Sequence, residues 1–169
     1  MAKDQQLAVV VNASGGKASR EGDALEGRLI AAFAAHGVTA EPHLVEGKAL
    51  AQTIADVRSA PVVAVGGGDG TLGSAAALLS KSGQVMAVLP LGTLNHLSID
   101  LGIPADLSEA AGVAVDGKVQ AIDLAEWEST QKLCLVPSAY LPNLLAKYDD
   151  KLHHLQLQKR QHRDVNSRN

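Results

Sequence analysis

The sequence predicts an α/β domain with a mostly parallel sheet covered by helices on both faces. Short, continuously apolar runs recur along the chain, as is typical of strands buried on both faces. Stretches with apolar residues at helical spacing separate these runs. Strands that alternate with helices in this way form a three-layer, Rossmann-like arrangement. The chain has 169 residues, 46% of them hydrophobic but only 2% aromatic, so one domain can bury a core of Ala, Val, Leu and Ile.

The individual elements follow from the same patterns. Helices are expected where apolar residues recur every three or four positions, at 20–36, 48–59, 71–79, 95–101 and 106–115. Strands are expected at the apolar runs 7–11, 61–65 and 85–89, and also at the mixed segments 38–45 and 119–124. Pro42 cannot donate a backbone hydrogen bond, which makes its strand a weak or edge strand.

Three loops rich in glycine and polar residues follow predicted strands, at 12–17, 66–71 and 90–95. Ligands of parallel sheets bind beyond the carboxyl ends of the strands. The three loops are therefore expected to face one cleft.

Composition narrows the choice of partners. The net charge of −3 and the scarcity of aromatic residues argue against nucleic acid as a partner. Cys134 is the only cysteine, so no internal disulfide or cysteine-based zinc site is expected. The apolar run 7–11 is too short for a signal-peptide core, and no run of eighteen apolar residues occurs, so a cytoplasmic location is expected.

The last part of the chain differs from the rest. All 16 glycines lie at or before Gly117, and the C-terminal end is rich in Gln, Arg, His and Asn. We therefore expect a nucleotide-binding domain at 1–126 and an atypical extension at 127–169 that is partly helical or disordered.

The turn Gly66–Thr71 is the strongest chemical signal, because it follows a buried strand and opens a helix. Glycines let the backbone approach a phosphate closely, and the helix N-terminus favours negative charge. Thr71 can cap the helix or donate its hydroxyl group to a phosphate, and Asp69 can accept from a hydrated Mg²⁺ ion.

Two other phosphate motifs fit less well. GxxxxGK[ST] fails, since Ala18 follows Gly16-Lys17 and position 11 is Val. Residues 68–73 match GxGxxG formally, but they follow the third expected strand, and the next strand runs into Pro90 without an acidic residue to hold a ribose. A dinucleotide-dependent dehydrogenase is therefore the weaker interpretation.

Three segments resemble one family in the right order. Gly66–Thr71 reads GGGDGT and resembles the signature of the diacylglycerol kinase catalytic domain, which bacterial lipid kinases and sphingosine kinases share; NAD kinases carry the related GGDGT. Residues 90–96, PLGTLNH, resemble the family's PLGTxND, and residues 11–16 resemble its opening segment. The resemblance covers residues 6–126.

The resemblance implies an ATP site with Mg²⁺, and transfer of the γ-phosphoryl group to a lipid hydroxyl at a membrane surface. Asp69 is the implied metal ligand, and Thr93 and Asn95 would face the phosphate acceptor. The implied nucleotide-binding residues are Asn12, Ser14, Gly15, Gly67, Gly68, Asp69, Gly70, Thr71, Thr93 and Asn95.

The sequence also departs from the family pattern. Ala13 replaces a proline, and His96 stands where aspartate is common. The family's second, largely β domain supplies the proposed general base, but we expect that domain to be absent here, so no catalytic base is assigned. An NAD-kinase-like activity and a catalytically inactive nucleotide-binding or interaction module remain alternatives, and homo-oligomerisation is left open.

Overall fold

The computed structural model describes residues 6–127, 132–136 and 155–157. Two compact units divide the chain, the first ending at Ala121 and the second beginning at Ile122. The division falls five residues before the expected boundary at 126.

The first unit contains a four-stranded parallel sheet in the order β2-β1-β3-β4. Its strands are β1 (Leu7–Asn12), β2 (Ala40–Val45), β3 (Val62–Gly67) and β4 (Val85–Pro90). The chain leaves β1 toward β2 on one side and later adds β3 on the other side of β1. The strand order thus reverses next to β1, which is where open α/β sheets bind ligands.

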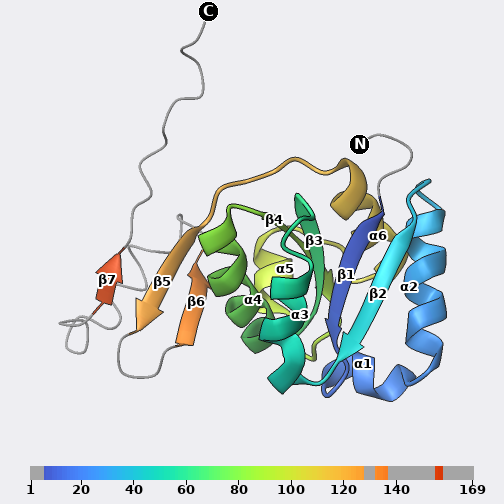
Figure 1. Ribbon diagram of the computed structural model, residues 1–169, viewed down its shortest axis with the longest axis horizontal. Coiled ribbons are helices and arrows are strands. Elements are labelled where there is room, and N and C mark those ends of the chain that lie inside the picture. Colours follow the sequence, from blue (N-terminus) through green and yellow to red (C-terminus); the bar gives the residue numbers. More distant parts are fainter. Residues whose placement is uncertain (1–5, 128–131, 137–154, 158–169) are drawn as a thin grey trace, which may run out of the picture. The chain divides into compact units, whose positions relative to one another are not determined.

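Helices cover both faces of this sheet. They are α1 (Gly16–Glu21), α2 (Ala24–Ala34), α3 (Leu50–Asp56), α4 (Asp69–Ser82), α5 (His96–Asp100) and α6 (Leu107–Asp116), and a 3₁₀ turn, η1 (Gly47–Ala49), precedes α3. Helices α2 and α6 pack together on one face, and α3 and α4 pack together on the other. Figure 1 shows β1 and β2 between α3 on one side and α2 on the other. The predicted three-layer α/β fold is confirmed.

The core explains why the apolar runs become central strands. Val9, Val10 and Val11 of β1 are fully buried, because helices cover both faces of the strand. On one face, Leu25, Leu29 and Phe33 of α2 pack in a cluster with alternate residues of β1. The aliphatic core predicted from composition is therefore present, with Phe33 as its buried aromatic side chain.

Single residues explain several features of the helices and strands. Pro42 lies in β2, which is an edge strand, as its missing N–H predicts. The Asp106 carboxylate accepts from the N–H groups of Ser108 and Glu109 and caps α6. Gly83 ends α4 in the left-handed conformation that glycine adopts without strain.

The second unit corrects the last expected strand. The strand predicted at 119–124 lies instead at β5 (Asp123–Trp127), and Val119 is 73% exposed. Strand β5 does not extend the parallel sheet but pairs antiparallel with β6 (Lys132–Val136) and β7 (Leu155–Leu157). The sequence of one strand does not identify the strands that pair with it. The partners of β5 are β6 and β7, which come later in the chain.

The two described segments after residue 127 are strands; the sequence predicts an extension that is partly helical or disordered. The rest of the predicted extension lies outside the described part of the chain, at residues 128–131, 137–154 and 158–169. In the described part, no helix combines the length and apolar character that a bilayer crossing requires.

Candidate functional site

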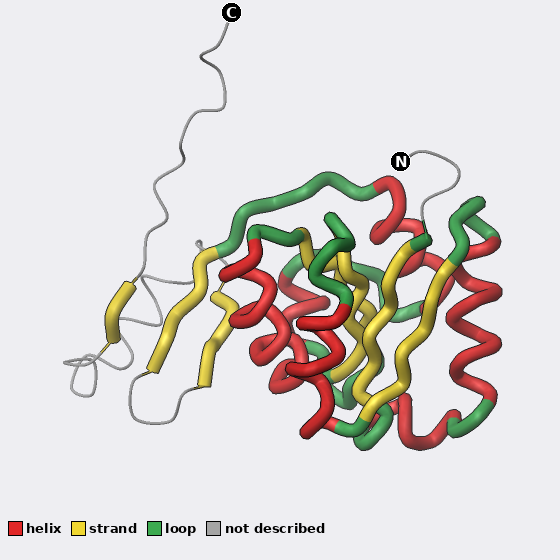
Figure 2. Tube along the Cα trace, viewed as in Figure 1, coloured by secondary structure: helices red, strands yellow, loops and turns green. Residues whose placement is uncertain are grey.

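A cavity of about 250 Å³ lies at the carboxyl edge of the parallel sheet. All three loops singled out in the sequence contribute to its wall. The lining residues are Asn12, Gly15, Gly16, Gly67, Gly68, Gly70, Thr71, Gly92 and Thr93. Figure 2 shows the connection after β1 passing directly into α1 at this end of the sheet. The expectation that the loops face one cleft is confirmed.

Glycines allow the three loop backbones to touch. A Cβ atom on Gly92 would lie 2.3 Å from the Cα atom of Gly68, and one on Gly16 would lie 2.5 Å from the Leu91 carbonyl oxygen. Gly16 also has a φ of 65°, which favours glycine. The Lys17 N–H donates to the same Leu91 oxygen at 2.8 Å and fixes the first loop to the third. Side chains at these positions would push the loops apart.

The N-terminus of α4 faces the cavity with unused donors. Gly68 is the N-cap residue, and its carbonyl oxygen accepts from Thr71 and Leu72. The N–H groups of Asp69 and Gly70 have no acceptor within the described part of the protein. Such groups and the helix dipole favour an anion, as in known phosphate sites.

Asn12 joins the first loop to the glycine turn. Its Nδ2 donates to the Thr71 Oγ1 atom at 3.0 Å, and its Oδ1 accepts from the Ser14 N–H at 3.0 Å. One side chain therefore orients the Thr71 hydroxyl group at the cavity wall and shapes the turn after β1. The hydroxyl group retains its own proton for donation to a ligand.

Asp69 lies between two loops. Its carboxylate accepts from the N–H of Leu97 at 3.0 Å and from the N–H of His96 at 3.3 Å, which places negative charge at the start of α5. The side chain stays 40% exposed, and the His96 Nδ1 atom lies 3.8 Å from it. A carboxylate has about four lone-pair sites, so these contacts leave capacity for a further partner.

Asn95 has a role that its position in the motif does not reveal. It is 7% exposed, and its φ of 54° is the left-handed conformation that asparagine tolerates. Its Oδ1 accepts from the Gly92 N–H at 2.9 Å, and its Nδ2 donates to the carbonyl oxygens of Gly92 and Pro90 at 3.0 and 3.4 Å. The side chain is thus turned into its own loop, where it fixes Gly92 against Gly68.

Seven of the ten candidate residues line the cavity: Asn12, Gly15, Gly67, Gly68, Gly70, Thr71 and Thr93. Ser14, Asp69 and Asn95 are outside the lining and connect to it through the hydrogen bonds described above. Gly16 and Gly92 line the cavity although the sequence analysis did not select them. Their position in glycine-rich loops could have indicated that they line the site. Only the close approach of the loop backbones shows why glycine is needed at these two positions.

The cavity wall is uncharged, because none of its lining residues is acidic, basic or histidine. Among the described residues, no three His, Cys, Asp or Glu side chains gather in a way that could hold a metal ion. The polar groups that the lining residues present to the cavity are backbone groups, hydroxyl groups and the Asn12 amide.

A parallel sheet with a glycine turn, a helix N-terminus and an uncharged, donor-rich cavity is an arrangement typical of phosphate-binding α/β domains. The family model of the diacylglycerol kinase catalytic domain matches residues 6–127. The chain therefore belongs to the diacylglycerol kinase catalytic domain family.

Individual relatives agree with this assignment. The chain is 45% identical over 65 residues to "Probable lipid kinase YegS-like" of Klebsiella pneumoniae (strain 342), covering 37% of this chain and 22% of that protein. It is 38% identical over 81 residues to the protein of the same name from Enterobacter sp. (strain 638), covering 46% of this chain and 26% of that protein. The matches thus span about a quarter of these relatives' length.

The fold also has a counterpart among solved structures. A diacylglycerol kinase from Bacillus anthracis str. Sterne superposes with a TM-score of 0.58 at 23% identity, covering 76% of this chain and 45% of that chain. At this identity, the likeness supports the fold.

Proposed function

We propose that this chain binds ATP with Mg²⁺ at the glycine-lined cavity and serves as the nucleotide-binding part of a lipid kinase. The observation that carries the proposal is the convergence of three loops on one cavity, with the N–H group of the lining residue Gly70 and that of its neighbour Asp69 left without acceptors at the α4 N-terminus. Family membership gives the reaction class, transfer of the γ-phosphoryl group of ATP to a lipid hydroxyl group.

The cavity suits phosphate groups better than an apolar ligand. Gly67, Gly68 and Gly70 offer backbone without side chains to block close approach, and the hydroxyl groups of Thr71 and Thr93 add donors. Phosphoryl transfer requires positioning and charge stabilisation more than covalent catalysis by the protein. A wall of backbone amides and hydroxyl groups meets that requirement.

The residues present also fit a magnesium ion. Mg²⁺ bound with nucleotides needs only one or two carboxylates, since phosphate oxygens and water complete its coordination. Asp69, partly exposed and flanked by the lining residues Gly68 and Gly70, is the carboxylate that we assign to it. When bound, the ion would neutralise charge on the phosphates.

The acceptor would approach from the side of Thr93. This residue is exposed, lines the cavity and lies in the loop that Asn95 fixes against Gly68. A lipid hydroxyl group placed beside Thr93 would lie near phosphates held at the α4 N-terminus, as an in-line transfer requires.

Transfer of labelled phosphate from ATP to a panel of acceptors tests the proposal. The panel contains diacylglycerol, related lipids and NAD, and Gly68→Val protein gives the background rate. We expect lipid phosphorylation above this background and none of NAD. Phosphorylation of NAD in preference to every lipid would contradict the lipid assignment. Equal signals from wild type and Gly68→Val would contradict the assignment of the site.

A further inference from the structure

We propose that Lys48, on the loop between β2 and α3, supplies the cationic side chain that binds the polyphosphate at this site. The inference rests on the proposed ATP site and extends it to a fourth loop, residues 46–49, that no motif identifies. The cavity wall lacks the positive charge that a polyphosphate would need. A nucleoside triphosphate is strongly anionic, yet none of the residues lining the cavity is a lysine or an arginine.

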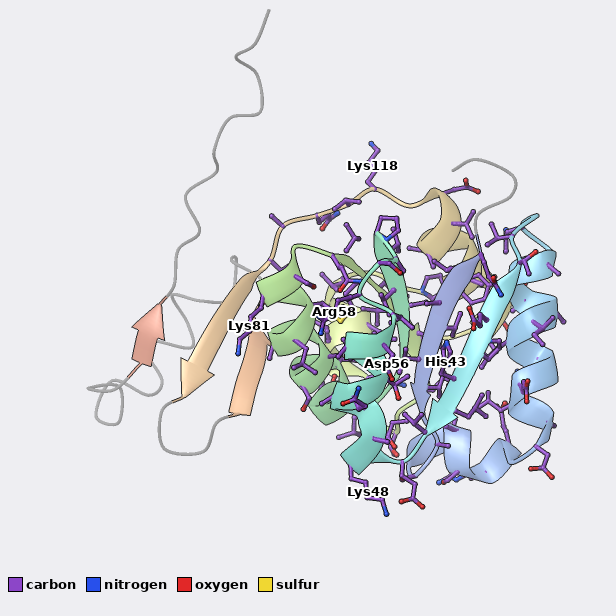
Figure 3. All side chains as sticks on the ribbon, in the orientation of Figure 1. His43, Lys48, Asp56, Arg58, Lys81 and Lys118 are labelled. Carbon is purple, nitrogen blue, oxygen red and sulfur yellow. The ribbon has the colours of Figure 1, made fainter. Side chains whose placement is uncertain are left out.

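The loop 46–49 borders the cavity through Asn12. A Cβ atom on Gly47 would lie 3.5 Å from the Nδ2 atom of Asn12, so the backbone of this loop lies beside a side chain of the cavity wall. The Ala13 N–H donates to the Val45 carbonyl oxygen at 2.8 Å and holds the start of the loop beside the first glycine loop. Figure 3 shows Lys48 at the same edge of the sheet.

The Lys48 side chain is exposed and is held by a surface ion pair. Its side chain is 84% exposed, and its partner is the Glu46 carboxylate at 2.9 Å, which is 69% exposed. Exposed ion pairs of this kind contribute little to stability, so exchanging Glu46 for a phosphate costs little. The flexible four-carbon stem and the strongly charged ammonium group suit a phosphate that varies in position. A hydrogen bond between an ammonium group and a phosphate is stronger than one between two neutral groups.

The other lysine close to these loops is placed differently. Lys17 follows the lining residue Gly16 in sequence, but its side chain belongs to a second, smaller cavity that also contains Glu21 and Arg28. Arg28 is paired there with Glu21. This neighbouring site has its own carboxylates, so we assign the phosphate contact to Lys48.

Calorimetric titration of the full chain with MgATP, ADP and AMP tests the assignment. The variant is Lys48→Gln, and the matched control is Lys118→Gln, an exposed lysine labelled at the opposite edge of the sheet in Figure 3. We expect Lys48→Gln to weaken MgATP binding by about 10- to 150-fold, as for loss of a hydrogen bond to a charged group. AMP binding should change less, and Lys118→Gln should change neither.

Glu46→Gln should have the opposite effect on MgATP affinity. It releases Lys48 and removes a carboxylate near the phosphates, so MgATP binding should tighten by about 2- to 5-fold, and adding Lys48→Gln should abolish that gain. Equal MgATP affinity in Lys48→Gln and Lys118→Gln would overturn this inference while leaving the proposed function intact. Failure of the wild type to bind MgATP would instead contradict the proposed function and this inference together.

Discussion

Replacing Asn95 tests the claim that a buried side chain, and not a ligand, shapes the loop at residues 90–95. Asn95→Ala leaves the Gly92 N–H without its acceptor and forces alanine into a φ of 54°. A buried, unpaired N–H costs about 1–3 kcal/mol, and a left-handed alanine costs about 1–2 kcal/mol, so about 2–5 kcal/mol of unfolding free energy should be lost. Asn95→Gly leaves the same N–H unpaired but adopts this φ freely, and should lose only about 1–3 kcal/mol.

Urea unfolding followed by far-ultraviolet circular dichroism measures both variants against wild type. Ser74→Ala is the control, because it removes an exposed hydrogen bond to the Gly70 carbonyl oxygen and should change stability by less than about 0.5 kcal/mol. MgATP affinity should also fall in both Asn95 variants, since Gly92 and Thr93 would no longer be fixed. If both Asn95 variants unfold within about 0.5 kcal/mol of wild type, the argument that this side chain holds the loop is refuted.

Three further predictions concern the same site. A double-mutant cycle between Asn12→Ala and Thr71→Val should show a coupling of about 0.5–1.5 kcal/mol in unfolding free energy, because the two side chains share a hydrogen bond of 3.0 Å; additive losses would show that the bond contributes nothing. Asp69→Ala should lose about 0.5–2 kcal/mol of stability as the N-terminus of α5 loses its acceptor. The magnesium-dependent gain in ATP affinity should disappear in the same variant, and its persistence would exclude Asp69 as the carboxylate that binds the ion. Lipid phosphorylation by this chain should run about 10²- to 10⁴-fold below that of a full-length relative assayed in parallel, because none of the described residues that line the cavity can act as a general base. A comparable rate would contradict this reasoning.

Much of the fold follows from the sequence because its signals are local. The fully apolar run of β1 and the edge-forming Pro42 each act within a few residues, and the structure shows both as expected. The strand near residue 123 did not follow in the same way. Its position and its antiparallel sheet depend on pairing with β6 and β7, which lie later in the chain.

The candidate site shows the same limit. Loop sequences were enough to predict one cleft, since parallel strands bring their carboxyl ends to one edge. They could not predict the direction of individual side chains. Asn95 lies inside its loop and Asp69 caps α5, although both belong to motifs that suggest direct contact with a ligand. Gly92 matters because its backbone touches Gly68, a contact between residues 24 positions apart that no local pattern encodes.

Calorimetric titration of MgATP into wild type and Gly68→Val tests the central claim most directly. Gly68 lines the cavity in an extended backbone conformation, and an added Cβ atom would make only an ordinary contact, 3.5 Å from the Cα atom of Gly92. The substitution should therefore leave the sheet folded while it obstructs the approach of phosphate. Gly27→Val is the control, because a Cβ atom at Gly27 on α2 meets nothing within 4 Å and lies outside the cavity. We expect wild type and Gly27→Val to bind MgATP with equal affinity, and Gly68→Val to bind it at least tenfold more weakly, or by about 1.4 kcal/mol. Equal affinity in all three proteins would contradict the central claim.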